Sequence, residues 1–311
     1  MLKLPTSGIS RSVVVHNCDL SIVCDWIEAC VIFDEKEVST TDVVDVLLED
    51  DVYDEQDFAR EFLSIVWEEL RRRAKLVSSP IGLQIQAQRV TCGDDWTADP
   101  AYSYCLALSL ASAFPDWKDA FGHDYTQQGA LFEDLTVEAL EKLFPLWKVH
   151  KTGWSPKQPA KLAGVVDDVV QKLYEVRGAE IARWLGTAAN EEGLDVLLYR
   201  EFPDTIAGFP LFLLQCASGT LWEDKLNAPN LGVWKNIVSF ASVPVKALAI
   251  PHALDADVLR QACVKVQGPL FDRYRLLGAR TAGAAWPSEA LQERLWDWMW
   301  PRVTALPRVD W

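Results

Sequence analysis

The chain has 311 residues and contains 45 Asp and Glu against 30 Lys and Arg, which gives a formal net charge of −15. Half of its residues are hydrophobic and 24% are charged, a balance that excludes a disordered or fibrous chain and provides enough apolar material for a sizeable core. No apolar run approaches the roughly 20 residues needed to cross a bilayer, so the sequence predicts no membrane-spanning segment. An acidic chain is also expected to repel nucleic acid, unless its charge is confined to one region.

The acidity is concentrated at one end of the chain. Residues 1–70 hold 17 acidic and four basic residues, a net charge of −13, whereas residues 71–311 are close to neutral. The densest stretch, 42–57, carries eight acids and no base. This stretch is typical of a solvated helical surface. The alternatives are a docking face for a basic partner, or an imitation of a phosphate backbone that covers a nucleic-acid groove.

Cysteine and histidine patterns exclude several kinds of site. The seven cysteines form no CxxC pair, so they are expected to be reduced thiols of a cytoplasmic protein. The start of the chain shows no apolar core followed by a small-residue cleavage site, so we expect no signal peptide. The four histidines show no HExxH or HxH spacing, and neither a Walker nor a GxGxxG pattern occurs. A His-based metal centre, an NTPase site and a dinucleotide site are therefore not expected.

An acidic, mainly helical N-terminal domain is predicted over residues 1–115. The expected elements are helices over 19–32, 40–49 and 55–76, and a strand over 81–90. Ser39, Thr40 and Thr41 supply good N-caps for the second helix. Residues 101–113 are compatible with either a helix or a strand, and 115–126 are predicted to form a boundary loop.

A second domain is predicted over residues 120–254, with its elements in the order α-β-β-β-α-β. The expected elements are a helix over 127–144, strands over 146–151, 193–202, 211–217 and 244–250, and a broken helix over 221–240. A helical insertion is expected over 156–189, and residues 255–311 are expected to form a helical, Trp-rich C-terminal extension. The predicted fold class is therefore mixed α/β (α+β), with a helical region on each side of the αβββαβ core.

Two of these strands, 193–202 and 211–217, are separated by Pro, Asp and Gly, a pattern typical of a hairpin. If the hairpin is centred near Thr205, paired residues have numbers that add to about 410, which places Asp195 opposite Gln215. Because side chains alternate along a strand, these two then share one face. They are candidates for a functional site, although an Asp can merely cap a turn and a Gln can be a satisfied polar residue at a strand end.

Three polar residues follow one another in a recognisable order. Glu133 lies in the first helix of the domain, in GALFEDL; Asp195 follows Gly-Leu at a strand start; and Gln215 closes the next strand, in LLQCA. In this order they resemble the PD-(D/E)XK nuclease superfamily, and within it the Mrr-like restriction endonucleases, which use Gln in the third motif. The resemblance covers about residues 127–250, rests on short motifs, and implies a restriction-endonuclease-like core.

The resemblance implies a site for Mg²⁺ or Mn²⁺, because phosphodiester hydrolysis requires a hard divalent cation. Asp195 would bind the cation directly, Gln215 would offer its amide oxygen, and Glu133 would reach it directly or through water. The family pattern places a lysine two residues after the third-motif residue, where this chain has Ala217. Lys225 is the preferred substitute for that ammonium group, and Lys151 is the second candidate.

Two functions of different classes are compatible with these residues. The first is a metal-dependent endonuclease acting on DNA in bacterial restriction or antiphage defence, a setting that only the resemblance suggests. Lys148, Lys151 and Lys157 are the candidate phosphate contacts. The second is a catalytically inactive nuclease-fold scaffold that binds nucleic acid or a protein partner of a defence complex, which Ala217 favours. A homodimer is compatible with the resemblance.

Overall fold

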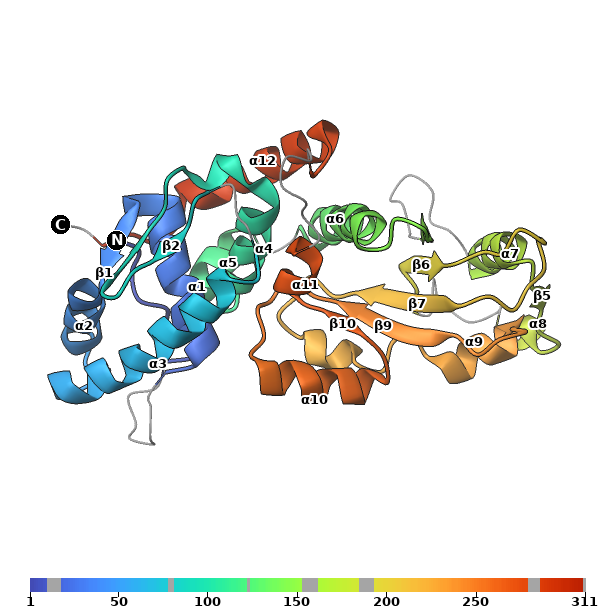
Figure 1. Cartoon of the computed structure of the whole chain (residues 1–311), viewed down its shortest axis with the longest axis horizontal. Coiled ribbons are helices and arrows are strands. Elements are labelled where there is room, and N and C mark those ends of the chain that lie inside the picture. Colours follow the sequence, from blue (N-terminus) through green and yellow to red (C-terminus); the bar gives the residue numbers. More distant parts are fainter. Residues whose placement is uncertain are drawn as a thin grey trace. The chain divides into compact units, whose positions relative to one another are not determined.

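The computed structural model describes residues 1–9, 18–77, 81–121, 124–152, 162–184, 193–278 and 286–309. The chain divides into two compact units, each assembled from segments distant in the sequence (Figure 1). Unit 1 comprises Met1–Asp124, Pro251–Asp255 and Arg280–Trp311, and unit 2 comprises Tyr125–Ile250 and Ala256–Ala279. The C-terminal extension expected from the sequence is thus shared between the two units. In the described ranges, no helix is both long enough and apolar enough to cross a membrane.

Unit 1 is mainly helical, as the sequence predicts. Its helices are α1 (Leu20–Cys30), α2 (Thr40–Glu49), α3 (Gln56–Ala74), α4 (Pro100–Leu110), α5 (Pro115–Phe121) and α12 (Glu289–Thr304). A π-helical turn, Val31–Glu35, extends α1, and a 3-10 turn, Trp96–Ala98, precedes α4. The predicted cap of α2 is confirmed: the Ser39 hydroxyl accepts from the Asp42 backbone N at 3.2 Å, and the Asp42 carboxylate accepts from the Ser39 backbone N at 2.8 Å.

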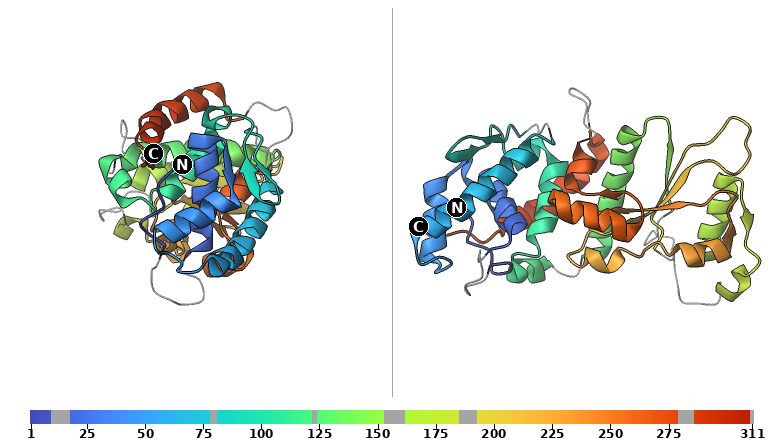
Figure 2. Two further views of the ribbon diagram at one scale, coloured as in Figure 1. Left: turned by 90° about the vertical axis from the view of Figure 1, so that its left-hand side faces the viewer. Right: turned by 60° about the horizontal axis from the view of Figure 1, so that its bottom comes forward.

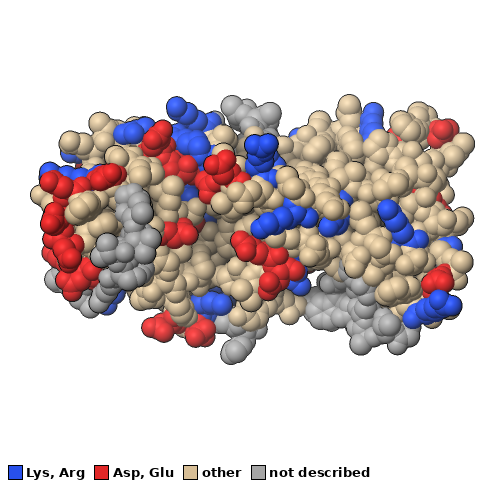
Figure 3. All heavy atoms as spheres, turned by 90° about the horizontal axis from the view of Figure 1, so that it is seen from below, with Lys and Arg blue, Asp and Glu red and all other residues tan. Residues whose placement is uncertain are grey.

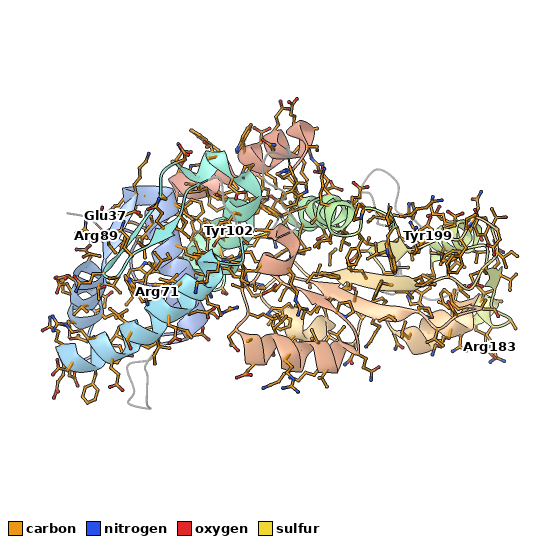
Figure 4. All side chains as sticks on the ribbon, viewed as in Figure 1. Glu37, Arg71, Arg89, Tyr102, Arg183 and Tyr199 are labelled. Carbon is orange, nitrogen blue, oxygen red and sulfur yellow. The ribbon has the colours of Figure 1, made fainter. Side chains whose placement is uncertain are left out.

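The strand predicted over 81–90 is instead two short strands, β2 (Gln84–Ile85) and β3 (Arg89–Thr91), which pair antiparallel. β3 also pairs antiparallel with β1 (Glu37–Ser39), which makes it the central strand of a three-stranded sheet. On its exposed side Arg89 Nη1 lies 2.8 Å from Glu37 Oε1 (Figure 4). A turn within the predicted strand allows β3 to pair on both edges.

Tertiary packing determines the secondary structure of two further segments of unit 1. The ambiguous segment 101–113 is helical (α4), and every residue of that helix is buried, so its sequence shows no amphipathic period. The loop predicted over 115–126 was wrong, because it contains α5. Trp117 anchors that helix by donating from Nε1 to the Arg302 backbone O of α12 at 2.9 Å. This partner lies far along the chain and leaves no local signal in the sequence.

A buried ionic network ties α1, α3 and α4 together in the core of unit 1. Arg73 of α3 is only 1% exposed, and its guanidinium lies 2.8 Å from Asp25 Oδ1 and 3.1 Å from Glu69 Oε1. Glu28 Oε1 lies 3.5 Å from Arg73 Nη1, and Glu28 Oε2 accepts from the hydroxyl of Tyr102, which is labelled in Figure 4, at 2.7 Å. Arg73 thus contacts three carboxylates, of which Glu69 is also paired with Arg72, whose Nε lies 2.6 Å from Glu69 Oε2.

The first and last described segments of unit 1 lie side by side at one end of this unit (Figures 1 and 2). Leu2 forms an antiparallel bridge with Arg308, and the Val309 backbone N donates to the Met1 backbone O at 3.0 Å. The tryptophans nearby act as packing anchors: the Arg302 guanidinium stacks 3.8 Å from the Trp298 ring.

Unit 2 is built on a mixed five-stranded sheet in the order β10-β9-β7-β6-β4. The strands are β4 (Lys148–Lys151), β6 (Val196–Tyr199), β7 (Leu211–Cys216), β9 (Val245–Ala249) and β10 (Leu270–Phe271). β4, β6 and β7 pair antiparallel, whereas β9 runs parallel to both β7 and β10. A separate pair, β5 (Val176–Arg177) and β8 (Val238–Ser239), is antiparallel. The mixed α/β class is therefore confirmed.

Helices cover both faces of this sheet. They are α6 (Tyr125–Leu143), α7 (Leu162–Leu173), α8 (Ile181–Trp184), α9 (Leu231–Ile237), α10 (Ala256–Val266) and α11 (Arg273–Leu277). Leu197 and Leu213 pack in one buried cluster with α7 and α9. Because side chains alternate along a strand, Phe212 points the other way, where it meets the ring of Trp147, just after α6.

Three expectations for unit 2 need correction. The C-terminal region is not wholly helical, because it contributes β10, which pairs with β9 through Leu270 and Leu248. The helical insertion also contains β5. The broken helix over 221–240 is a 3-10 turn (Trp222–Lys225) followed by α9 and β8. These strands have only two residues each, which is too short to produce an alternating pattern in the sequence.

Candidate functional site

The β6–β7 hairpin has the register that the sequence predicts. Val196 pairs with Leu214, so Asp195 and Gln215 come next, opposite each other at the open end of the hairpin. The backbone N of Asp195 donates to the Leu214 backbone O at 3.0 Å, and Gln215 Nε2 donates to Asp195 Oδ2 at 2.6 Å. The predicted juxtaposition of these two side chains is confirmed.

Asp195 is held from several directions and is only 4% exposed. Its Oδ2 accepts a second hydrogen bond from the backbone N of Cys216 at 2.6 Å. On the other side, the Thr152 backbone N donates to the Asp195 backbone O at 2.9 Å, and the Thr152 hydroxyl donates to the Leu194 backbone O at 2.7 Å. The residue after β4 and the last two residues of β7 therefore fix both the backbone and the carboxylate of Asp195.

Gly193 allows the chain to pass close to Gln215. It has a φ of +70°, in the left-handed region that favours glycine. A Cβ at this position would lie 2.6 Å from Gln215 Oε1 and 3.0 Å from the Ala228 Cβ. A side chain here would therefore strain the backbone and displace the Gln215 amide.

Three charged side chains, Lys151, Glu133 and Asp134, join α6 to the end of β4. Lys151 Nζ lies 3.0 Å from Glu133 Oε2 and 2.8 Å from Asp134 Oδ1. Burial raises the pKa of Glu133 despite the opposing effect of Lys151. Burial by itself would lower the pKa of Lys151, but Asp134 and Glu133 outweigh it and leave that pKa raised. Lys151 is therefore an ammonium ion at neutral pH.

Cys216 lies between the Asp195–Gln215 pair and these three charged side chains. Its backbone N bonds to Asp195, while burial raises the pKa of its thiol well above the ordinary value, and the carboxylates of Asp195 and Glu133 raise it further. Because side chains alternate along β7, the Cys216 side chain points toward α6 and the Gln215 side chain away from it. The structure thus brings Asp195 together with Gln215, and Glu133 together with Lys151, on either side of residue 216. A buried, protonated thiol is a poor nucleophile.

The remaining predicted residues lie as follows. Lys225 is exposed at the end of the 3-10 turn, whereas Lys151, the second candidate for the ammonium group, contacts Glu133 directly. Lys148, a candidate phosphate contact, is exposed and forms an ion pair with Glu201. Lys157, another such candidate, lies outside the described residues. Lys151, the third of these candidates, is already engaged by two carboxylates.

The donor chemistry fits a hard cation. Asp195, Gln215 and Glu133 offer only carboxylate and amide oxygens, which suit Mg²⁺ or Mn²⁺. Rotation of the Gln215 amide by half a turn would exchange Nε2 for Oε1 beside the Asp195 carboxylate. In the described ranges, no group of three or more His, Cys, Asp or Glu side chains is close enough to hold a metal ion. The candidate site therefore depends on Asp195 and the Gln215 amide, whereas Glu133 contacts Lys151 on the α6 side of residue 216.

Sequence reasoning missed three contributors. Asp134 directly follows Glu133 in GALFEDL, so the adjacent acid was visible, but only packing shows that both carboxylates contact Lys151. Thr152 and the backbone N–H of Cys216 orient Asp195, and no motif marks either of them. No family model, curated protein or solved structure matches the chain.

Proposed function

We propose that unit 2 is a metal-dependent nuclease of the PD-(D/E)XK type, which hydrolyses phosphodiester bonds of DNA. The observation that carries this proposal is the pairing of Asp195 with Gln215 at the open end of the hairpin. The order α6-β4-β6-β7-α9-β9, with three antiparallel strands and a fourth parallel to the third, supports a restriction-endonuclease-like core. Bacterial restriction or antiphage defence is the setting that the resemblance suggests.

Each residue of the site has a distinct role in this proposal. Asp195 binds the cation through its carboxylate, and Gln215 binds it through its amide oxygen after rotation. Glu133 lies in α6 in contact with Lys151, on the other side of residue 216 from Gln215, and would reach the cation through water; its raised pKa reflects a buried position. A bound divalent cation polarises the phosphate and activates water.

Lys151 supplies the ammonium group that position 217 lacks. Its place against Glu133 favours it over the exposed Lys225. A charged group held this way stabilises negative charge that develops on a phosphate oxygen. The two carboxylates that hold Lys151 fix its direction before substrate arrives.

A second candidate function is a catalytically inactive scaffold that binds nucleic acid or a protein partner of a defence complex. Ala217 is buried where the family pattern has a lysine. Glu133 and Asp134 offset the charge of Lys151, and Asp195 Oδ2 already accepts two hydrogen bonds. If no other side chain supplies the ammonium group that position 217 lacks, these features favour a binding function over catalysis.

Plasmid cleavage separates the two functions. The wild-type chain, Asp195→Ala, Lys151→Ala and Lys225→Ala would be incubated with supercoiled DNA in Mg²⁺ or Mn²⁺, and with EDTA. We expect cleavage that requires the metal, Asp195 and Lys151 but tolerates the loss of Lys225. Cleavage that persists in Asp195→Ala would remove the proposed site. DNA binding without cleavage under every condition would favour the scaffold.

A further inference from the structure

Helix α3 in unit 1 presents apolar side chains to solvent along the edge of its buried face. Phe62 and Val66 are buried against the rest of unit 1, whereas Phe58 and Ile65 are 58% and 40% exposed. Phe58 and Ile65 are seven residues apart, so they lie on the same side of the helix, two turns from each other. The folding of unit 1 does not require these two exposed side chains.

Acidic side chains surround this apolar pair. Glu61 and Glu68 follow Phe58 and Ile65 by three residues each, which places them on the same side of α3. The first turn of α3, the preceding loop and α2 add further exposed acids: Asp42, Asp45, Glu49, Asp50, Asp51, Asp54, Glu55 and Asp57. Acidic side chains gather over the α2 end of unit 1 in Figure 3.

These carboxylates are not engaged in ion pairs in the part of the chain that the structure describes. Across the described residues, none of the acids between Asp42 and Glu68 that face solvent forms an ion pair. Arg60 is the only base between residues 42 and 68, and it lies on another side of the helix from Phe58, whereas Arg72, seven residues after Ile65 on the same side of α3, is paired with Glu69. Like charges held this close repel one another, and a cationic partner would relieve that repulsion.

We propose that the face of α3 formed by Phe58, Glu61, Ile65 and Glu68 docks a basic, amphipathic helix of another protein. Charge complementarity identifies the partner, because this face repels nucleic acid and acidic peptides and attracts Lys and Arg. The apolar pair requires a partner with apolar side chains at matching helical spacing. This surface lies in unit 1 and uses no residue of the proposed nuclease site.

The apolar pair distinguishes this surface from an imitation of a phosphate backbone. Such an imitation needs charge alone, so it would bind any flexible basic segment. Phe58 and Ile65 instead provide side chains that a partner helix can bury, flanked by acids at the rim. Apolar anchors with a charged rim are the usual composition of a protein interface.

The test uses the full chain and a synthetic probe. The probe is a fluorescein-labelled helical peptide of about three heptads, with Leu along one side and Lys and Arg beside it. The first control peptide has the same composition in an order that scatters Leu around the helix, and the second replaces Lys and Arg by Glu. Fluorescence anisotropy gives the Kd for the wild-type chain, for Phe58→Ser combined with Ile65→Ser, and for Glu61→Gln combined with Glu68→Gln. Phe202→Ser, at an exposed aromatic residue of unit 2, is the matched control.

We expect the amphipathic basic peptide to bind, and each double variant to raise its Kd by about tenfold or more. Phe202→Ser should leave the Kd unchanged, and the acidic peptide should not bind. Equal binding of the scattered peptide, or a Kd insensitive to Phe58→Ser with Ile65→Ser, would overturn the proposal in favour of a purely electrostatic surface. Absence of binding by the amphipathic peptide would overturn it as well. Because all four substituted residues are exposed, circular dichroism should show native folding in each variant.

Discussion

Gln215 donates a hydrogen bond from Nε2 to Asp195 Oδ2 at 2.6 Å, next to Val196 and Leu214, the last paired residues of β6 and β7. The same carboxylate oxygen accepts from the Cys216 backbone N, so two donors converge on it. A cation held by Asp195 must therefore compete with the Gln215 amide or recruit its oxygen. This relationship makes Asp195 the residue on which the proposed chemistry depends.

The lysine substitutions separate the two candidates for the ammonium group. Lys151→Met should reduce cleavage by about 10²-fold, because it removes a fixed positive charge from the site. Lys225→Met makes the same substitution at an exposed position, and it should leave the cleavage rate within about twofold of the wild-type rate. Initial rates of plasmid nicking in Mn²⁺ measure the effect of each substitution on cleavage. A large loss in Lys225→Met with none in Lys151→Met would restore the preference drawn from the sequence.

Ala217→Lys tests whether a lysine at the family position improves the site. Position 217 is two residues after Gln215, so its side chain leaves the strand on the same face. We expect cleavage to rise by about tenfold or more in Ala217→Lys, since an added ammonium group stabilises developing negative charge. Ala217→Met has a side chain of similar length without the charge and should show no gain. Equal rates in the two variants would show that the missing lysine does not limit the site.

His150 should make the stability of the chain depend on pH. Its imidazole contacts Asp168 of α7, with Lys172 Nζ 3.7 Å from that carboxylate. Burial lowers the pKa of His150 below its ordinary 6.5, although Asp168 opposes this shift. The unfolded chain therefore binds the proton more readily, so the contribution of His150 is present above pH 6.5 and is lost as the pH falls below that value.

Urea unfolding between pH 7.5 and 5.5 measures this effect. The fall in the midpoint for the wild-type chain should exceed that for His150→Gln, which does not titrate. His252→Gln gives a comparison at another buried histidine. An identical pH dependence in wild type and His150→Gln would contradict the assignment.

Arg73 should be essential to the stability of unit 1. Arg73→Met removes the cation that Asp25 and Glu28 share, while Arg72 still pairs with Glu69, and this loss should cost about 3–5 kcal/mol of unfolding free energy. Arg89→Met removes the exposed ion pair with Glu37 and should cost at most about 1 kcal/mol. Chemical denaturation followed by circular dichroism compares the two. Similar small losses in both variants would mean that the buried network adds little.

The sequence predicts local features of this structure well. The cap of α2 depends on residues three apart, and the Asp195–Gln215 register depends on one short hairpin, so both can be inferred from neighbours in the chain. Contacts between distant segments cannot. The ion pair from Lys151 to Glu133 depends on how α6 packs on β4, and the helix α5 depends on a contact from Trp117 to α12.

The same distinction explains the domain boundaries. Residues 255–311 show helical patterns throughout, but Leu270 and Phe271 gain their strand pairing only from β9. The division of this region between two units follows from packing and has no counterpart in composition. Similarly, the Cys216 N–H that orients Asp195 belongs to the backbone, which no residue pattern can identify.

The most direct test of the proposed site compares two aspartates of one hairpin. Asp195→Asn removes the charge at the open end, and Asp204→Asn removes a charge in the turn, where Asp204 Oδ1 accepts from the Ile206 backbone N at 3.1 Å. The measurement is the single-turnover rate of plasmid cleavage in Mn²⁺, with folding checked by circular dichroism. We expect Asp195→Asn to lose about 10²-fold or more in rate while Asp204→Asn retains the wild-type rate. Equal rates in all three chains, or no metal-dependent cleavage by the wild-type chain, would contradict the assignment of Asp195 as the metal ligand of a nuclease.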